Sequence, residues 1–211
     1  MAGPRFLLHH AAGSRSVSVA WLLEEAGAGY ELHWHDLQAG SQKDPGFLAL
    51  NPAGKLPVLV DRGPDGSWQV VVTEGAAIAA YVADLLPEAG LSPPIGTPER
   101  AAWQFWMTYG PAVAEPAMAD LAFPRARPAP ASALGWPAFA AVQDRVETAL
   151  AGHSWLVGAR FTTADLVVGG LLGFMQSFGM LRPGPEIARY LGAIEARPAR
   201  QRAQALQPPG A

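Results

Sequence analysis

The Pro- and Gly-rich segment 87–98 (PEAGLSPPIGTP) most constrains this fold, because strand-like patterns occur only before it. Apolar runs of strand type flank two helical patterns there, with strands expected at 6–9, 30–37, 57–61 and 69–73 and helices at 14–27 and 74–86. A strand–helix–strand order predicts a parallel pair, and the turn at 64–66 predicts an antiparallel hairpin. Only helical patterns follow the segment, at about 99–122, 138–150, 161–178, 185–195 and 198–206.

We therefore expect an α/β domain at residues 1–86, a linker at 87–97 and an all-helical domain at 98–211. The chain has no cysteine, which excludes disulfides, thiolate zinc sites and a cysteine nucleophile. A net charge of −3 without a basic stripe argues against a nucleic-acid partner. No apolar run approaches the ~20 residues of a membrane helix or resembles a signal peptide, so we expect a cytoplasmic protein with no membrane partner.

The pair Leu56-Pro57 stands at the entrance to an apolar run that otherwise reads as a buried strand. Proline has no backbone N–H for a strand ladder, so it is usually confined to strand starts and edges. An ordinary strand start is one interpretation. The other is that the backbone of Leu56 is kept out of the sheet to bind something.

Four motifs in order resemble the cytosolic glutathione S-transferases, and together they span nearly the whole chain: HHAAGSRSVSVAWLLEEAGAGYE (9–31), GKLPVL (54–59), TEGAAIAAYV (73–82) and FTTADL (161–166). The first is most similar to a bacterial and fungal branch that opens its first helix with Ser-Arg-Ser. The resemblance implies a thioredoxin-like βαβ–ββα domain that binds glutathione as co-substrate, a helical domain that binds an apolar electrophile, and a homodimer.

In thioredoxin-like folds the peptide bond before this proline is cis, so the resemblance implies that Leu56 and Pro57 present a backbone edge to the cysteinyl part of glutathione. The expected helix at 74–86 begins at Glu74-Gly75, and helix N-termini bind anions. The Gly75 amide can therefore hold the γ-glutamyl carboxylate while Glu74 pairs with the neighbouring ammonium group. The family usually has serine where this chain has Gly75, which removes one hydroxyl contact worth about 1 kcal/mol.

The resemblance also implies that Gln42, Lys43 and Lys55 approach the glycine carboxylate of glutathione. Lysine suits this task as a point charge on a flexible stem. The alternative is that both lysines are solvated surface residues.

The thiol of glutathione needs a donor or a cation that stabilises its thiolate, since only the thiolate is nucleophilic. Ser14 is the predicted donor and Arg15 the second choice, with Ser16 beside them counted among the glutathione-binding residues. Aligned without gaps, the usual catalytic serine position falls on Gly13 and the usual cysteine position on Arg15. No tyrosine precedes Tyr30, so tyrosine-type activation is not expected. Helix N-capping is the structural alternative for Ser14.

An apolar substrate pocket is expected from one histidine and an aromatic- and Met-rich set: His10, Trp106, Met107, Tyr109 and Phe174. The same aromatic residues could instead form a helical core. His9 and His10 are adjacent, but neighbours on a strand point to opposite faces and no third ligand is evident, so no metal site is expected. Thr162 and Asp165 are interpreted as a structural helix start.

The favoured activity is therefore conjugation of the glutathione thiolate to an apolar electrophile. One alternative is a glutathione-dependent peroxidase or disulfide reductase that uses the sulfur of the ligand, because the chain has no cysteine. The other is a non-catalytic module of the same fold.

Overall fold

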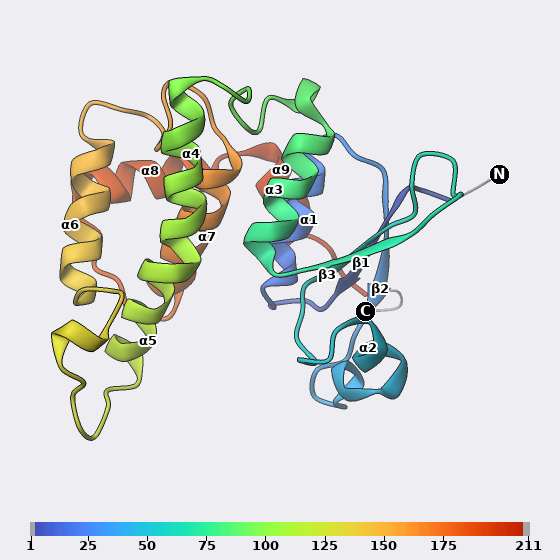
Figure 1. Cartoon of the computed structure of the whole chain (residues 1–211), viewed down its shortest axis with the longest axis horizontal. Coiled ribbons are helices and arrows are strands. Elements are labelled where there is room, and N and C mark those ends of the chain that lie inside the picture. Colours follow the sequence, from blue (N-terminus) through green and yellow to red (C-terminus); the bar gives the residue numbers. More distant parts are fainter. Residues whose placement is uncertain (1–2, 209–211) are drawn as a thin grey trace. The chain divides into compact units, whose positions relative to one another are not determined.

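The computed structural model describes residues 3–208, which divide into two compact units (Figure 1). The first unit runs to Ala89 and also includes the chain from Arg197 onward, while the second is Gly90–Ala196. The elements of the first unit are β1 (Phe6–His10), α1 (Ser16–Glu25), β2 (Tyr30–Trp34), η1 (Ser41–Lys43), α2 (Pro45–Leu50), β3 (Val58–Asp61), β4 (Val70–Thr73), α3 (Gly75–Leu85), η2 (Pro87–Ala89) and α9 (Pro198–Gln204).

The first unit is built on a four-stranded sheet with the strand order β2-β1-β3-β4. β1 and β2 are parallel, whereas β3 is antiparallel to both β1 and β4, as the sequence pattern predicts. The side chain of His10 contacts Ser16 of α1, while that of the preceding residue, His9, packs on Phe47 of α2. Because consecutive strand residues point to opposite faces, α1 and α2 cover opposite faces of the sheet. The predicted thioredoxin-like fold class is confirmed.

A buried charge cluster connects Arg5, just before β1, with Asp61 of β3 and Tyr81 of α3. The carboxylate of Asp61 is fully buried and accepts two hydrogen bonds from Arg5, at 2.7 and 2.8 Å. It also accepts from the Tyr81 hydroxyl at 2.6 Å and the Gly63 amide at 2.9 Å. Burial alone would raise the pKa of Asp61, but these donors outweigh it and lower that pKa below its usual value.

All regular secondary structure within residues 90–196 is helical. The elements are α4 (Pro98–Tyr109), the π-helical turn η3 (Gly110–Ala114), α5 (Glu115–Ala122), η4 (Ala131–Ala133), α6 (Phe139–Leu150), α7 (Thr163–Ser177) and α8 (Pro185–Glu195). The π turn stands where Gly110 and Pro111 predict a kink. α7 packs against α4 and α8, and α6 packs against α5 and α8.

α7 begins with the capping box that the sequence predicts. Asp165 accepts a hydrogen bond from the Thr162 amide at 2.8 Å and one from the Leu156 amide at 2.8 Å. The side chain is fully buried, and burial raises the pKa of Asp165 to about 6 although these donors oppose the shift. Thr162 and Asp165 therefore organise a helix start and an adjoining loop, which is the structural role expected for them.

The C-terminal helix α9 packs on α1 and so belongs to the first unit. Arg197 forms an ion pair with Glu25 of α1, and Arg202 forms one with Glu24. The domain boundaries expected from sequence place these residues with the helical domain instead, because local patterns do not show which unit a helix packs on. No helix within residues 3–208 is long and apolar enough to cross a membrane.

Candidate functional site

One end of the sheet gathers the predicted glutathione-binding segments, and strand direction explains why. β1 ends at His10, where the loop 11–15 begins, and His9 is opposite Val58 at the start of β3. β4 ends at Thr73, which is also opposite Val58. The loop that holds Ser14, the pair Leu56-Pro57 and the pair Glu74-Gly75 therefore lie at the same end of three adjacent strands.

The peptide bond between Leu56 and Pro57 is cis, as the resemblance implies. Leu56 precedes β3 and is half-buried, while Pro57 is buried. Within residues 3–208, no hydrogen bond engages the N–H or the C=O of Leu56. Both groups are therefore available to an extended peptide placed beside β3.

Glu74 is exposed, and its backbone is strained, with φ at +68° and ψ at 119°. Non-glycine residues rarely adopt positive φ, and such strain concentrates at binding sites. Glu74 is the N-cap of α3, and Gly75 is the first residue of this 11-residue helix. A Cβ atom added at Gly75 would meet nothing within 4 Å, so space for a ligand group is open at this amide.

A chain of hydrogen bonds links Ser14 to a buried histidine on β1. The Ser14 and Ser16 hydroxyls are 2.6 Å apart, and the Ser16 hydroxyl is 2.8 Å from Nδ1 of His10. Ser14 also accepts from the Ser16 amide at 3.2 Å and donates to the Ala11 carbonyl at 2.8 Å. Ser14 is half-buried, whereas Ser16 and His10 are completely buried.

The direction of this hydrogen-bond chain depends on the tautomer of His10. If Nδ1 of His10 carries the proton, it donates to Ser16, and the Ser16 hydroxyl donates to Ser14. The Ser14 hydroxyl then keeps its own proton for the Ala11 carbonyl or for a bound anion. Burial lowers the pKa of His10, so the ring is neutral at pH 7, and its Nε2 atom has no hydrogen-bond partner within residues 3–208.

The full burial of His10 corrects one prediction. His10 was expected to line the substrate pocket, but its side chain has no exposed surface and lies beneath the first turn of α1. Arg15, the second candidate for thiolate stabilisation, is an exposed residue at the N-cap of α1.

The three residues predicted at the glycine end lie in two segments that are in contact. Nζ of Lys43 in η1 donates to the carbonyls of Ala53 and Gly54, both at 3.2 Å. This links η1 to the segment that carries the exposed Lys55. The Oε1 atom of Gln42 is buried and has no hydrogen-bond partner within residues 3–208.

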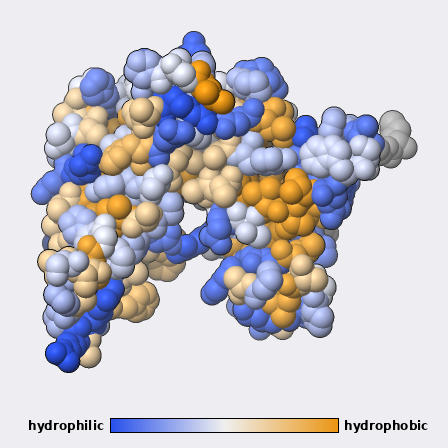
Figure 2. Space-filling model, in the orientation of Figure 1, coloured by the Kyte–Doolittle hydropathy of each residue, from blue (hydrophilic) through white to orange (hydrophobic). Residues whose placement is uncertain are grey.

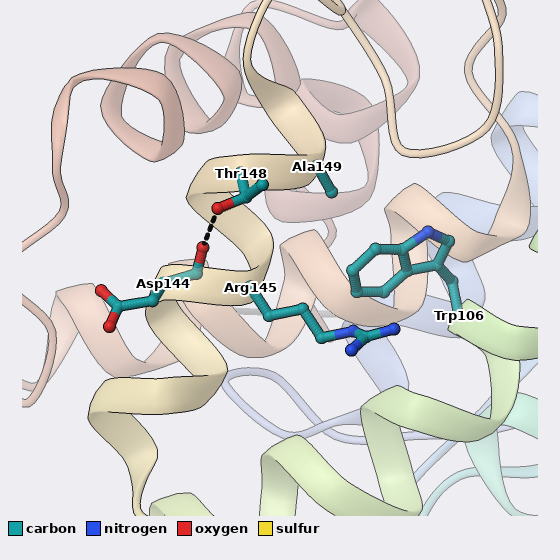
Figure 3. A pocket seen from close by; sticks show the side chains of 5 residues that line it. All are labelled: Trp106, Asp144, Arg145, Thr148 and Ala149. Carbon is teal, nitrogen blue, oxygen red and sulfur yellow. Dashed lines mark hydrogen bonds between the residues drawn. The ribbon is translucent and has the colours of Figure 1, made fainter.

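The aromatic residues predicted for the substrate pocket belong to the second unit. Trp106, Met107 and Tyr109 of α4 are each no more than 7% exposed, whereas Phe174 of α7 is 39% exposed. Trp106 lines a shallow hollow of about 460 Å³ whose other side is formed by α6 through Asp144, Arg145, Thr148 and Ala149 (Figure 3).

Sequence reasoning missed these four α6 residues. Their spacing places them on one face of a helix, which is the only signal that could have indicated them. In Figure 3 the Arg145 side chain extends from α6 toward Trp106. Its guanidinium also lies 4.6 Å from the ring centre of Phe105, so the hollow combines a cation with aromatic surface.

Known proteins match the chain over most of its length. Residues 14–85 match the family model "Glutathione S-transferase, N-terminal domain", and residues 105–198 match "Glutathione S-transferase, C-terminal domain". Glutathione S-transferase 3 of Zea mays is 34% identical over 205 residues, covering 91% of this chain and 89% of the relative. The disulfide-bond oxidoreductase YfcG of Escherichia coli is 38% identical over 96 residues, covering 44% of this chain and 43% of the relative.

Among solved structures, the glutathione transferase URE2P8 of Phanerochaete chrysosporium with oxidized glutathione matches with a TM-score of 0.76 at 26% identity. The match covers 96% of this chain and 94% of that protein.

Proposed function

Because the chain belongs to the glutathione S-transferase family, we propose that it conjugates the thiolate of glutathione to an apolar electrophile. The observation that carries the proposal is the unpaired backbone of Leu56 beside the start of α3, at one end of the sheet. An extended peptide with a carboxylate and an ammonium group at one end fits these two features together.

In the proposed complex the cysteinyl residue of glutathione pairs with the N–H and C=O of Leu56. The γ-glutamyl carboxylate binds at the Gly75 amide, where the macrodipole of α3 favours negative charge. Glu74 pairs with the ammonium group next to that carboxylate. Strain at Glu74 supports this assignment, because the surrounding structure maintains it at a cost of about 1–3 kcal/mol.

The glycine carboxylate of glutathione is assigned to Gln42, Lys43 and Lys55. Lys55 is exposed and can approach as a point charge. Lys43 already donates to two carbonyls, so its role is to hold η1 against the segment 53–55 while its charge attracts the carboxylate.

Ser14 is the proposed donor to the sulfur, with Ser16 and His10 positioning its hydroxyl. When the Ser14 proton turns from the Ala11 carbonyl to the sulfur, its oxygen still accepts from Ser16. This donation stabilises the thiolate and lowers the pKa of the thiol. The thiolate then attacks the electrophilic carbon, the new C–S bond forms, and the leaving group departs with the bonding electron pair.

The electrophile is assigned to the helical unit, through Trp106, which lines the hollow, and the exposed Phe174. Their aromatic surfaces suit an apolar molecule. Met107 and Tyr109 were expected to line the same pocket, but each is no more than 7% exposed, so they are assigned to the core of this unit.

Disulfide reduction is a second candidate, supported by the similarity to the disulfide-bond oxidoreductase. Since this chain has no cysteine, the thiolate of glutathione would attack the disulfide and release one thiol. A second glutathione thiolate would attack the mixed disulfide, yielding oxidised glutathione and the second thiol.

A homodimer is proposed as well. Figure 2 shows apolar residues gathered over the strands of the first unit. Val70 on the edge strand β4 is 39% exposed, and the nearby Trp68 is 45% exposed. Exposed apolar surface on an edge strand favours a covering partner. Sedimentation equilibrium tests this, with a 22.2 kDa species as the contradicting result.

Glu74→Gln tests the glutathione site because it removes the charge while keeping the shape of the side chain. We expect glutathione binding to weaken by about 10- to 150-fold, measured by calorimetry, since hydrogen bonds to charged groups contribute about 1.5–3 kcal/mol. Glu88→Gln, an exposed acidic residue of η2, is the matched control and should bind like the wild type. Equal binding by both variants would contradict the site.

The two activities are separated by assaying wild type with an aryl halide and with a mixed disulfide of glutathione. Formation of the aryl conjugate supports the transferase, and turnover of the disulfide alone supports the second candidate. Glutathione binding without either turnover would indicate a non-catalytic member of the fold.

A further inference from the structure

Three histidines of the first unit converge on the face of the sheet that α2 covers. His9 of β1 is directly opposite His33 of β2, and His35 follows two residues later on the same face. One ring nitrogen from each lies within 4.8 Å of the other two. The ring centres of His9 and His33 are 4.8 Å apart, and those of His33 and His35 are 4.9 Å apart.

We propose that His9, His33 and His35 bind a divalent transition-metal ion of the Zn²⁺ class through their imidazole nitrogens. Imidazole is a preferred ligand for zinc, copper and nickel, and three protein ligands leave one position for water. The adjacent pair at 9–10 does not form the site, because His10 points to the opposite face as expected. The other two ligands, His33 and His35, lie on the neighbouring strand β2 and just after its end.

The three nitrogens lie within 4.8 Å of one another and must approach by up to about 1.5 Å to reach metal geometry. In a tetrahedral site with Zn–N of about 2.0–2.1 Å, ligand nitrogens are about 3.3 Å apart. Nδ1 of His9 and Nε2 of His35 are already 2.9 Å apart, so one proton must lie between these two lone pairs. A metal ion displaces that proton, the ring that carried it becomes protonated at its other nitrogen, and both nitrogens of the pair then act as ligands.

The surroundings orient the imidazoles. The second ring nitrogen of His35, Nδ1, is 3.1 Å from the Ser41 hydroxyl. When Nδ1 donates to this hydroxyl, Nε2 keeps the lone pair that a metal ligand needs.

Charge and access also favour a cation. The carboxylate of Asp44 interacts electrostatically with His35, which places a negative charge near the cluster. His9 and His35 are 6% and 8% exposed, whereas His33 is exposed. A metal ion can therefore enter past His33 and be held by the two buried rings. Phe47 packs on both of these, with ring centres 5.3 and 4.6 Å away.

Cobalt titration of the full chain, purified without a histidine tag and without glutathione, tests the site through the visible absorption of bound Co²⁺. We expect one equivalent to bind to the wild type. His33→Ala should weaken binding by about 100-fold, since even outer partners of a metal site contribute 10–100-fold. His153→Ala is the matched control, because His153 is an exposed histidine of the second unit and should leave binding unchanged.

The unfolding midpoint of each variant, measured in a chelator that removes metal, shows whether the variant is folded. A second measurement with added Zn²⁺ should give a higher midpoint for the wild type and His153→Ala but not for His33→Ala. Absence of binding in the wild type, or equal binding by the wild type and His33→Ala, would overturn the proposal. In that case the three rings form a packed aromatic cluster under α2. Glutathione binding is not part of this test, so its outcome is independent of the proposed transferase site.

Discussion

Gly75→Ser would restore the hydroxyl that related transferases carry at the start of α3. A Cβ added at this position meets nothing within 4 Å, so the substitution brings no clash. A serine hydroxyl at the helix N-terminus can donate to the γ-glutamyl carboxylate. A hydrogen bond to a charged group contributes about 1.5–3 kcal/mol, and we take about 1 kcal/mol because Gly75 is half-buried and solvent competes. That gain corresponds to about fivefold tighter glutathione binding.

Gly75→Ala shows how much of the effect of Gly75→Ser comes from replacing glycine and how much comes from the added hydroxyl. Both variants lose the flexibility of glycine in the unfolded chain, which stabilises the folded protein by about 0.4–1 kcal/mol at a compatible position. Both should therefore raise the unfolding midpoint by a similar amount, but only Gly75→Ser should tighten binding measured by calorimetry.

A ligand without the α-carboxylate tests whether the added hydroxyl acts through that group. With γ-aminobutyryl-cysteinyl-glycine, which lacks the α-carboxylate, the wild type and both variants should bind equally. Equal affinities of the Ser and Ala variants for glutathione itself would refute the placement of this carboxylate at the N-terminus of α3.

Three further predictions concern the thiolate, the helical core and the buried charge cluster. Ser14→Ala should raise the pKa of the bound thiol by about one unit, which is visible as ultraviolet thiolate absorbance against pH, and an unchanged titration would move the role to Arg15 or the backbone. Gly169→Ala should destabilise the protein to chemical denaturation by about 1–3 kcal/mol, because its Cβ would overlap a side chain of α8 and lie 3.0 Å from a tyrosine hydroxyl there. Gly173→Ala on the same helix should gain up to about 1 kcal/mol, since its nearest contact is at 4.0 Å, and equal effects would contradict this packing. Tyr81→Phe should lower the free energy of unfolding by about 1–3 kcal/mol, because Asp61 loses the hydroxyl that donates to it at 2.6 Å. An unchanged free energy of unfolding would mean that water takes the place of this hydroxyl.

Much of the fold could be predicted because its signals are local. The strand and helix periods before residue 87, the absence of strand patterns after it, and the helix start at Thr162 are readable within a few residues. The unusual backbone at Leu56-Pro57 was also predictable, since proline before a strand limits what the backbone there can do, and the bond is cis. The binding role of Leu56 and Glu74 stays a prediction. The domain to which α9 belongs was not predictable, because amphipathic helices pack on any apolar face that is near enough.

The side-chain constellations depend on pairing between distant segments. Ser14 was predicted as a lone donor, whereas its link through Ser16 to His10 exists because β1 ends beneath the first turn of α1. The convergence of His33 and His35 on His9 follows from the register of β1 and β2, and a shift of one residue would turn these side chains to opposite faces.

By itself, then, the sequence determined which segments form strands and helices and which backbone positions are exceptional, because both follow from the chemistry of neighbouring residues. Only the tertiary structure decided which side chains meet, because strand register and helix packing bring together groups that no local pattern relates.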